Sequence, residues 1–399
     1  MALPLATALA SLLAQAAVGV DGLARIETRG TAGTSAASTA PAVTHAETQV
    51  DASIGAEFGS APVRFQLRYA PRVIFSLTPD PGTPGSDVLH NGTLVGDVLV
   101  SPRDHLRLSQ SFSYGDQTFS PLVPGELGGK PSSTPPPLDP QLARLAVLAY
   151  VASESTVTYD HKLAPNVKLE TYGTYLMNGG ADAIGRTVLP LQHGVVAGSS
   201  VGLLLSPVDE VSFHLNANVA RVAHQDSALL VGSAEWRTRL SRLTQADLSL
   251  GGGAGGDRSP TGWKWEPTLL LGAGITRTVP LQHQDLNAGV RGTLTSSIDR
   301  FGGGVYQVAD LSAQATYSPL RAVSFGPSAG VSRALTGGTR GATVVHGDFN
   351  LSYGLFDKLA LSLGVRGSWE QSAEAIQPRQ TGSRWAAFLS LVAADHGSL

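Results

Sequence analysis

Apolar and polar residues alternate with a period of two along most of this chain, from about residue 45 onward. In 63–69 the odd positions are apolar and the even positions are polar or charged, and 359–366 repeats the alternation near the C-terminus. Successive side chains of a β-strand point to opposite faces, so each such segment predicts a strand with one apolar and one polar face. The alternation therefore predicts an all-β protein. The apolar faces of its strands either pack against each other in a dry core or face a lipid bilayer.

The connections between these segments alternate in length. The short ones are rich in Pro, Asp, Asn and Ser, the residues that favour turns, and lie at 60–62, 101–104, 163–166, 207–210, 241–244, 280–283, 319–322 and 356–358. The longer ones lie at 77–90, 115–144, 178–191, 256–263, 298–304, 336–341 and 372–383, with one short exception near 224–226. Tight periplasmic turns and longer extracellular loops are typical of bacterial outer-membrane barrels.

The number and length of the segments favour the bilayer. We count about 17 runs after residue 45, most of roughly 10 to 15 residues, and a tilted strand needs about 9–11 residues to cross a membrane. Residues 20–30 supply one further candidate strand, which brings both termini to the periplasmic side. The sequence therefore predicts a transmembrane antiparallel up-and-down β-barrel of about 18 strands, with 16 as the alternative.

Composition narrows the classes of protein. The chain has 28 basic and 31 acidic residues, a formal charge of -3 and 15% charged residues, so no nucleic-acid partner is indicated. Mean hydropathy is only +0.05, as expected when half of the strand residues face lipid and half face water. Cysteine is absent, which excludes disulfides, thiolate metal sites and cysteine nucleophiles.

The N-terminus predicts export. Residues 1–20 contain no charged side chain, and Ala14-Gln15-Ala16 matches an A-x-A cleavage pattern. We expect 1–16 to be a signal peptide, with a short membrane anchor as the alternative, and 17–399 to form a single barrel domain.

The polar face of the strands gives the candidate site. A charge on the lipid face costs about 2–4 kcal/mol at mid-bilayer, so charged strand residues should face the lumen. The predicted lumen-lining residues are Arg64, Arg68, Arg72, Arg107, Asn216, Asn218, Arg237, Arg239, Asp285, Arg291, Asp310, Asp348, Asn350, Arg366 and Glu370. The first four arginines either form an electropositive strip or pair with acids such as Asp51, Glu57 and Asp97, which would fix strand register.

Two further segments have a predicted placement. The long extracellular loop 115–144, rich in Pro and Gly, either folds into the lumen and constricts the pore or stays on the surface. Gly252–Asp257 matches a single calcium β-helix repeat, which needs stacked copies to work, so a loop tip at the end of a strand is the preferred interpretation.

Several aromatic residues are interpreted as interface-belt or packing residues: Tyr150, Tyr159, Tyr172, Trp236, Trp265, Trp369 and Trp385.

No pattern indicates catalysis or a cofactor. The ten His are scattered, and neither G-x-S-x-G nor H-E-x-x-H occurs. We therefore expect neither an enzyme nor a metal site.

The export-type N-terminus, the alternating connections and the final run 384–392 resemble Gram-negative outer-membrane β-barrels of the large porin type. In strand number and Ala/Gly/Arg-rich style the chain is similar to 18-stranded barrels that export polysaccharides, such as the alginate exporter and barrels of myxobacterial exopolysaccharide pathways. This resemblance implies an outer-membrane location. It also implies membrane lipid, polar solutes or a polysaccharide chain, and periplasmic export components as partners.

The favoured function is thus an outer-membrane porin-like channel, and more narrowly the terminal conduit for export of a polysaccharide. A barrel that anchors a surface complex without transport and a soluble secreted β-protein remain as alternatives.

Overall fold

The structure, a computed structural model, describes residues 19–35, 43–76, 86–118, 147–281, 285–299, 303–320, 322–337, 342–356, 359–371 and 381–398. These residues form one antiparallel sheet of 19 strands and a short helix. The first strands are β1 (Gly19–Ser35), β2 (Val43–Ser60), β3 (Val63–Tyr69), β4 (Arg72–Ser76), β5 (Ser86–Ser101), β6 (Asp104–Thr118), β7 (Val147–Ala164), β8 (Val167–Gly180), β9 (Gln192–Leu204) and β10 (Asp209–Val222). The remaining strands are β11 (Gln225–Ser241), β12 (Thr244–Ser259), β13 (Gly262–Val279), β14 (Leu286–Ile298), β15 (Val305–Leu320), β16 (Val323–Ala334), β17 (Thr343–Phe356), β18 (Leu359–Gln371) and β19 (Thr381–Ser398), and the helix is α2 (Ala183–Val188).

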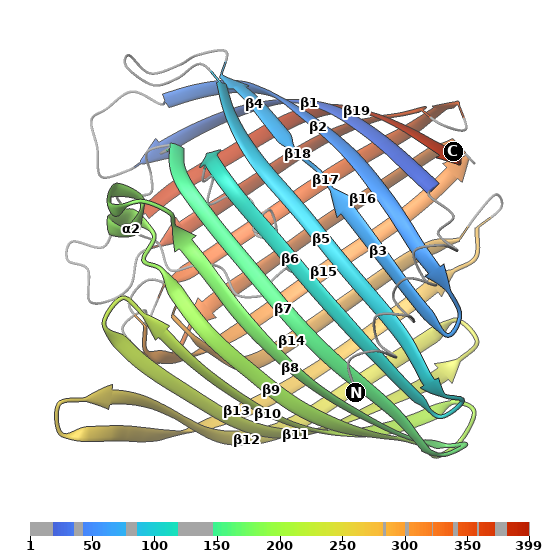
Figure 1. The fold of residues 1–399 in the computed structure, drawn as a ribbon, viewed down its shortest axis with the longest axis vertical. Helices are drawn as coiled ribbons and strands as arrows, with labels where there is room; N and C mark the ends of the chain where they lie inside the picture. Colours follow the sequence, from blue (N-terminus) through green and yellow to red (C-terminus); the bar gives the residue numbers. More distant parts are fainter. Residues whose placement is uncertain are drawn as a thin grey trace, which may run out of the picture.

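The pairing of the strands closes the sheet into a barrel (Figure 1). Except for β3 and β4, which do not pair with each other, each strand pairs with its neighbours in sequence, and β1 also pairs with β19 over its whole length, from Gly19 opposite Ser398 to Ser35 opposite Gly382. Both β3 and β4 lie between β2 and β5, so they are two halves of one strand position. The 19 strands therefore fill 18 positions (19 minus one). An antiparallel up-and-down barrel of about 18 strands is confirmed, and the alternative of 16 is not supported.

The break between β3 and β4 was not predicted. It falls at Ala70-Pro71, where the ring nitrogen of Pro71 has no hydrogen to donate to the ladder. Asn91 on β5 bridges the gap, because its backbone oxygen accepts from Ala70 N at 2.8 Å and its side chain donates to Ala70 O at 3.1 Å.

Most short connections lie at one end of the barrel and most longer ones at the other, as the sequence predicted. Two connections differ: the one predicted as a longer loop at 256–263 is a turn between Ser259 and Gly262, and the one predicted as a short turn at 280–283 extends from Val279 to Leu286. Two-residue turns at 61–62, 102–103, 165–166 and 242–243 mark the short-turn end. At the long-connection end the helix α2 fills the β8–β9 connection, where Asp182 caps it by accepting from Gly185 N at 2.5 Å. Loop 115–144 begins later than predicted, since β6 extends to Thr118, and its remainder lies outside the described residues. The predicted signal peptide also lies outside them.

The two faces of the sheet differ in polarity. Along β3, β10 and β18, one face exposes apolar side chains such as Leu67 (49%), Leu215 (57%) and Leu363 (48%). Trp236, Trp265 and Trp369 are also 41–51% exposed, as expected of interface residues. Tyr150 is instead a packing residue, because it is 2% exposed.

Little of the barrel is a packed core. Tyr306, Val308 and Ala334 form a small buried apolar cluster, and they lie at the long-connection end of β15 and β16. Among the described residues, no helix has the length and apolar character required to cross a bilayer.

Candidate functional site: the inner wall

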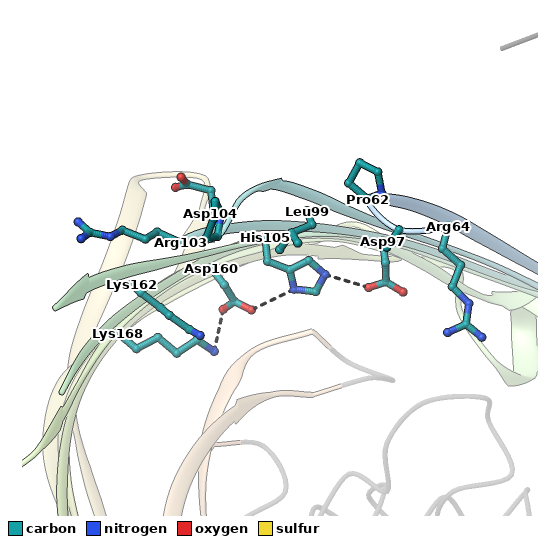
Figure 2. Close-up of a pocket in the computed structure, with 12 residues that line it drawn as sticks. Pro62, Arg64, Asp97, Leu99, Arg103, Asp104, His105, Asp160, Lys162 and Lys168 are labelled. Atoms are coloured by element: carbon teal, nitrogen blue, oxygen red, sulfur yellow. Dashed lines mark ion pairs between the residues drawn. The ribbon is translucent and has the colours of Figure 1, made fainter. Parts of the chain in front are cut away.

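The inner face can be identified from the side chains of β3 to β8. Figure 2 shows Arg64, Asp97, His105, Asp160 and Lys168 on the concave side of the curved sheet, whereas Asp104 points to the other side. The register carries this assignment around the barrel, because residues directly opposite each other on paired strands share a face.

A row of charges of alternating sign crosses this wall near the short-turn end. Arg64 on β3 forms an ion pair with Glu57 on β2. On the next strands, Arg107 Nε lies 3.0 Å from Asp97 Oδ1. His105 connects this pair with β7, since its ring nitrogens lie 3.2 Å from Asp97 Oδ1 and 3.8 Å from Asp160 Oδ2.

The row ends on β8. Lys168 Nζ lies 2.8 Å from Asp160 Oδ1 and 3.1 Å from Glu170 Oε2. Arg64, Asp97, His105, Asp160 and Lys168 also line a recess of about 550 Å³ at this end of the barrel (Figure 2). Because each cation in the row has an acid beside it, the wall offers many hydrogen-bonding groups with little net charge.

The opposite part of the barrel follows the same arrangement. Arg237 lies 3.0 Å from Glu235 and 3.6 Å from Glu210, and Arg291 NH2 lies 3.3 Å from Asp247 Oδ2. Asp310 accepts from Ser332 Oγ at 2.5 Å. Asp348 accepts from Ser328 and lies opposite Arg366 in register.

These contacts decide between the two interpretations of the first arginines. Arg64 and Arg107 pair with Glu57 and Asp97, two of the acids suggested by the sequence, so they do not form a purely positive strip. Arg68 donates to Ser53 Oγ at 3.1 Å. Arg72 lies opposite Asp51 in register.

The other predicted lumen residues are placed as follows. Asn216 accepts from Tyr172 Oη at 2.6 Å on the inner face, so Tyr172 is not an interface residue. Asn218 shares the inner face of β10 with Asn216, Arg239 that of β11 with Arg237, and Asn350 that of β17 with Asp348. The side chain of Glu370 lies outside the described part of the structure. Asp285 precedes β14 and is exposed.

Several acids that complete the pairs were not among the predicted lumen-lining residues. They include Asp160, Glu210 and Asp247, the partners of Lys168, Arg237 and Arg291. The alternation of the sequence could have identified them, because each lies an even number of positions from another inner-facing residue of its own strand.

At the long-connection end, the tip of the β14–β15 hairpin leans against the inner face of β11 and β12. Gly304 N donates to Ser227 Oγ at 3.0 Å, and Val305 N donates to Asp257 Oδ1 at 3.2 Å. Ser227 in turn donates to Asp257 Oδ1 at 2.8 Å and is fully buried. The hairpin tip therefore narrows this end of the barrel.

The prediction for Gly252–Asp257 is wrong. The segment lies inside β12, paired with β11 on one side and β13 on the other. Gly255 faces the β14–β15 tip, and a Cβ at this position would collide with the side chain of Val305. The glycines therefore serve close packing within the sheet, where the sequence suggested a loop.

Within the described residues, no group of three His, Asp or Glu side chains is arranged to hold a metal ion.

Comparisons with known proteins agree with this architecture. Residues 11–399 match the model of the EpsX exopolysaccharide export family. No match was found among curated proteins. The fold is similar to that of OccK2 (OpdF) from Pseudomonas aeruginosa, with a TM-score of 0.50 and 11% identity over 95% of this chain and 98% of that one.

Two other solved barrels are similar. OccAB1 from Acinetobacter baumannii has a TM-score of 0.50 and 11% identity over 94% of this chain and 96% of that chain. The FrpB iron transporter from Neisseria meningitidis, in its F5-1 variant, has a TM-score of 0.54 and 8% identity over 93% of this chain and 81% of that chain. At these identities the likeness concerns the fold.

Proposed function

Because the chain belongs to the EpsX exopolysaccharide export family, we propose that it is the outer-membrane channel through which a secreted polysaccharide leaves the cell. The observation that carries the proposal is the closed barrel with an exposed apolar outer face and a charged, hydrogen-bonding inner face. We place the short-turn end in the periplasm and the long-connection end outside. Periplasmic export components would then meet the short-turn end.

We assign the wall of the permeation path to the predicted lumen residues together with Asp97, His105, Asp160, Lys168 and Asp247. Asp97, Asp160 and Asp247 lie 2.8–3.3 Å from Arg107, Lys168 and Arg291, so cations and acids alternate along the wall and it has little net charge with which to select a strongly charged polymer. Exposed pairs of this kind contribute about 0–1 kcal/mol each to stability, so they can exchange hydrogen bonds with passing hydroxyls at low cost. We therefore propose a neutral or weakly charged polysaccharide.

The long-connection end of the barrel, which the β14–β15 tip narrows, limits the width of a polymer that can pass. A chain leaving the barrel must pass the β14–β15 tip held by Ser227 and Asp257. We propose that the tip determines how wide a polymer the channel admits. A barrel that only anchors a surface complex would instead keep this end shut.

Conductance across a planar bilayer tests the proposal. The refolded protein is expected to give stepwise current, and neutral dextran of a size that enters the barrel should reduce it. Dextran sulfate of equal size serves as the matched probe and should block no better than dextran. Absence of current from a preparation that migrates as a folded barrel would favour the anchoring function.

A further inference from the structure

A cluster of basic and aromatic side chains lies on the outer face of β10 to β13, at the long-connection end. We call Arg221, Asp226, Arg258, Trp263 and Trp265 the outer-rim cluster. Their strands are neighbours in the sheet (Figure 1), and the register sets Arg221 opposite Asp226 and Arg258 opposite Trp263.

These residues share the face of the lipid-exposed apolar residues. Arg221 has the same parity on β10 as Leu215 and Val219, which are 57% and 53% exposed. Trp263 and Trp265 have the same parity on β13 as Ile275, which is 48% exposed. The cluster therefore faces the bilayer and not the lumen.

Its depth corresponds to a headgroup layer. Arg221 lies 12 residues after Asp209, the first residue of β10. At about 3.3 Å per residue and a tilt of about 40°, this is roughly 30 Å from the short-turn end, which equals the thickness of the hydrocarbon core. With the orientation proposed above, the cluster lies at the headgroups of the outer leaflet.

The two arginines converge on one carboxylate and keep further donors exposed. Arg221 donates to Asp226 through Nε at 2.6 Å and through NH2 at 3.0 Å, and Arg258 NH1 donates to the same carboxylate at 3.3 Å. Both arginine side chains remain 62% exposed, whereas that of Asp226 is 18% exposed. A guanidinium has five N–H donors, so this group holds two oriented cations with unused donors and an excess of one positive charge.

A stacked pair of indoles lies beside these cations. The ring centroids of Trp263 and Trp265 are 5.6 Å apart with an interplanar angle of 24°, and the two side chains are 42% and 51% exposed. Gly256 allows this arrangement, because a Cβ there would come within 2.7 Å of the Trp265 ring. Flat exposed indoles are suited to stacking against the C–H faces of sugar rings, and guanidinium groups bind phosphate bidentately.

We propose that the outer-rim cluster binds a phosphorylated glycolipid of the outer leaflet, with the arginines on its phosphate and the tryptophans on its sugars. The site is separate from the lumen, but the inference rests on the outer-membrane orientation proposed above. It would fix the barrel among its surrounding lipids next to the β12–β13 hairpin.

Lipid binding to the purified full-length chain tests this site. The barrel in detergent is titrated with Kdo2-lipid A, with its monophosphorylated form and with phosphatidylglycerol, and bound lipid is counted by native mass spectrometry. We expect the bisphosphorylated glycolipid to bind best. The double variant Arg221→Gln/Arg258→Gln should bind it at least about tenfold more weakly.

A matched control is available at the other end of the barrel. Arg103→Gln/Arg277→Gln also removes two arginines, one in the 102–103 turn and one on the outer face of β13, and should bind like the unaltered protein. Equal binding by the Arg221/Arg258 variant, or equal binding of phosphatidylglycerol, would overturn the proposal. If the variant does not fold, the binding of the three lipids to the unaltered protein still tests whether the site prefers a bisphosphorylated glycolipid. The conductance of the same preparation reports on the channel separately.

Discussion

The inner wall near the short turns and the inner wall at the long-connection end of β11–β15 are organised by different means. Near the short turns, long charged side chains such as Arg107 and Lys168 pair across neighbouring strands. At the other end, glycine and a backbone-binding carboxylate allow the β14–β15 tip to pack against β11 and β12. The ion pairs near the short turns leave a wide polar wall. At the long-connection end, glycine has no side chain, so the β14–β15 tip can approach the wall and narrow the opening.

The largest effect is expected from filling the space between Gly255 and Val305. Gly255→Val would displace the β14–β15 tip, because even a Cβ collides there. We expect single-channel conductance to rise by about twofold or more, as a hydrophobic or steric constriction limits current through a pore. Gly202→Val is the inner-face control, since a Cβ there would meet no atom closer than 3.7 Å, and its conductance should be unchanged.

The wall of β2–β8 is tested by removing its acids. Asp97→Asn combined with Asp160→Asn deletes two negative charges and leaves Arg107 and Lys168 without these partners. We expect the reversal potential in a salt gradient to shift toward anions, with a change of about twofold in the permeability ratio. Dextran sulfate should then block better than dextran. An unchanged reversal potential would mean that ions do not pass this wall.

A smaller effect of opposite sign is expected from Arg64→Gln. This change leaves Glu57 without its ion pair and moves the charge of the wall by one unit. Reversal potentials should therefore shift slightly toward cations. Thermal stability should change by less than about 1 kcal/mol, because exposed ion pairs contribute little. A shift toward anions would contradict the placement of Arg64 in the ion path.

The difference between the two regions also explains what the sequence could predict. Side-chain parity is local, so the strands, the short turns and the inner placement of Arg64 and Arg107 follow from the alternation alone. The β14–β15 tip depends on contacts between residues far apart in the chain, such as Gly304 and Ser227. A glycine run such as 252–256 has low strand propensity by itself, and only the pairing with β11 and β13 places it in a strand.

The choice between two predicted roles has the same origin. Tyr150 and Tyr172 are interpreted from the sequence as interface-belt or packing residues, and the structure favours packing, since one is buried and the other donates to Asn216 on the inner face. Their positions depend on which parity faces inward on β7 and β8. That choice is fixed by pairing around the closed ring and not by the aromatic residues themselves.

The central claim is that one face of each strand meets lipid and the other meets the lumen, and two neighbouring positions on β18 test it most directly. Leu363 is 48% exposed on the outer face, and Ser362 lies opposite Ser352 on the inner face. Leu363→Arg puts a charge on the lipid face, further from the strand end than the interface, and should abolish the folded, fast-migrating band of unboiled membrane extracts. Ser362→Arg should retain that band. Loss of the band in Ser362→Arg with its retention in Leu363→Arg would contradict the account.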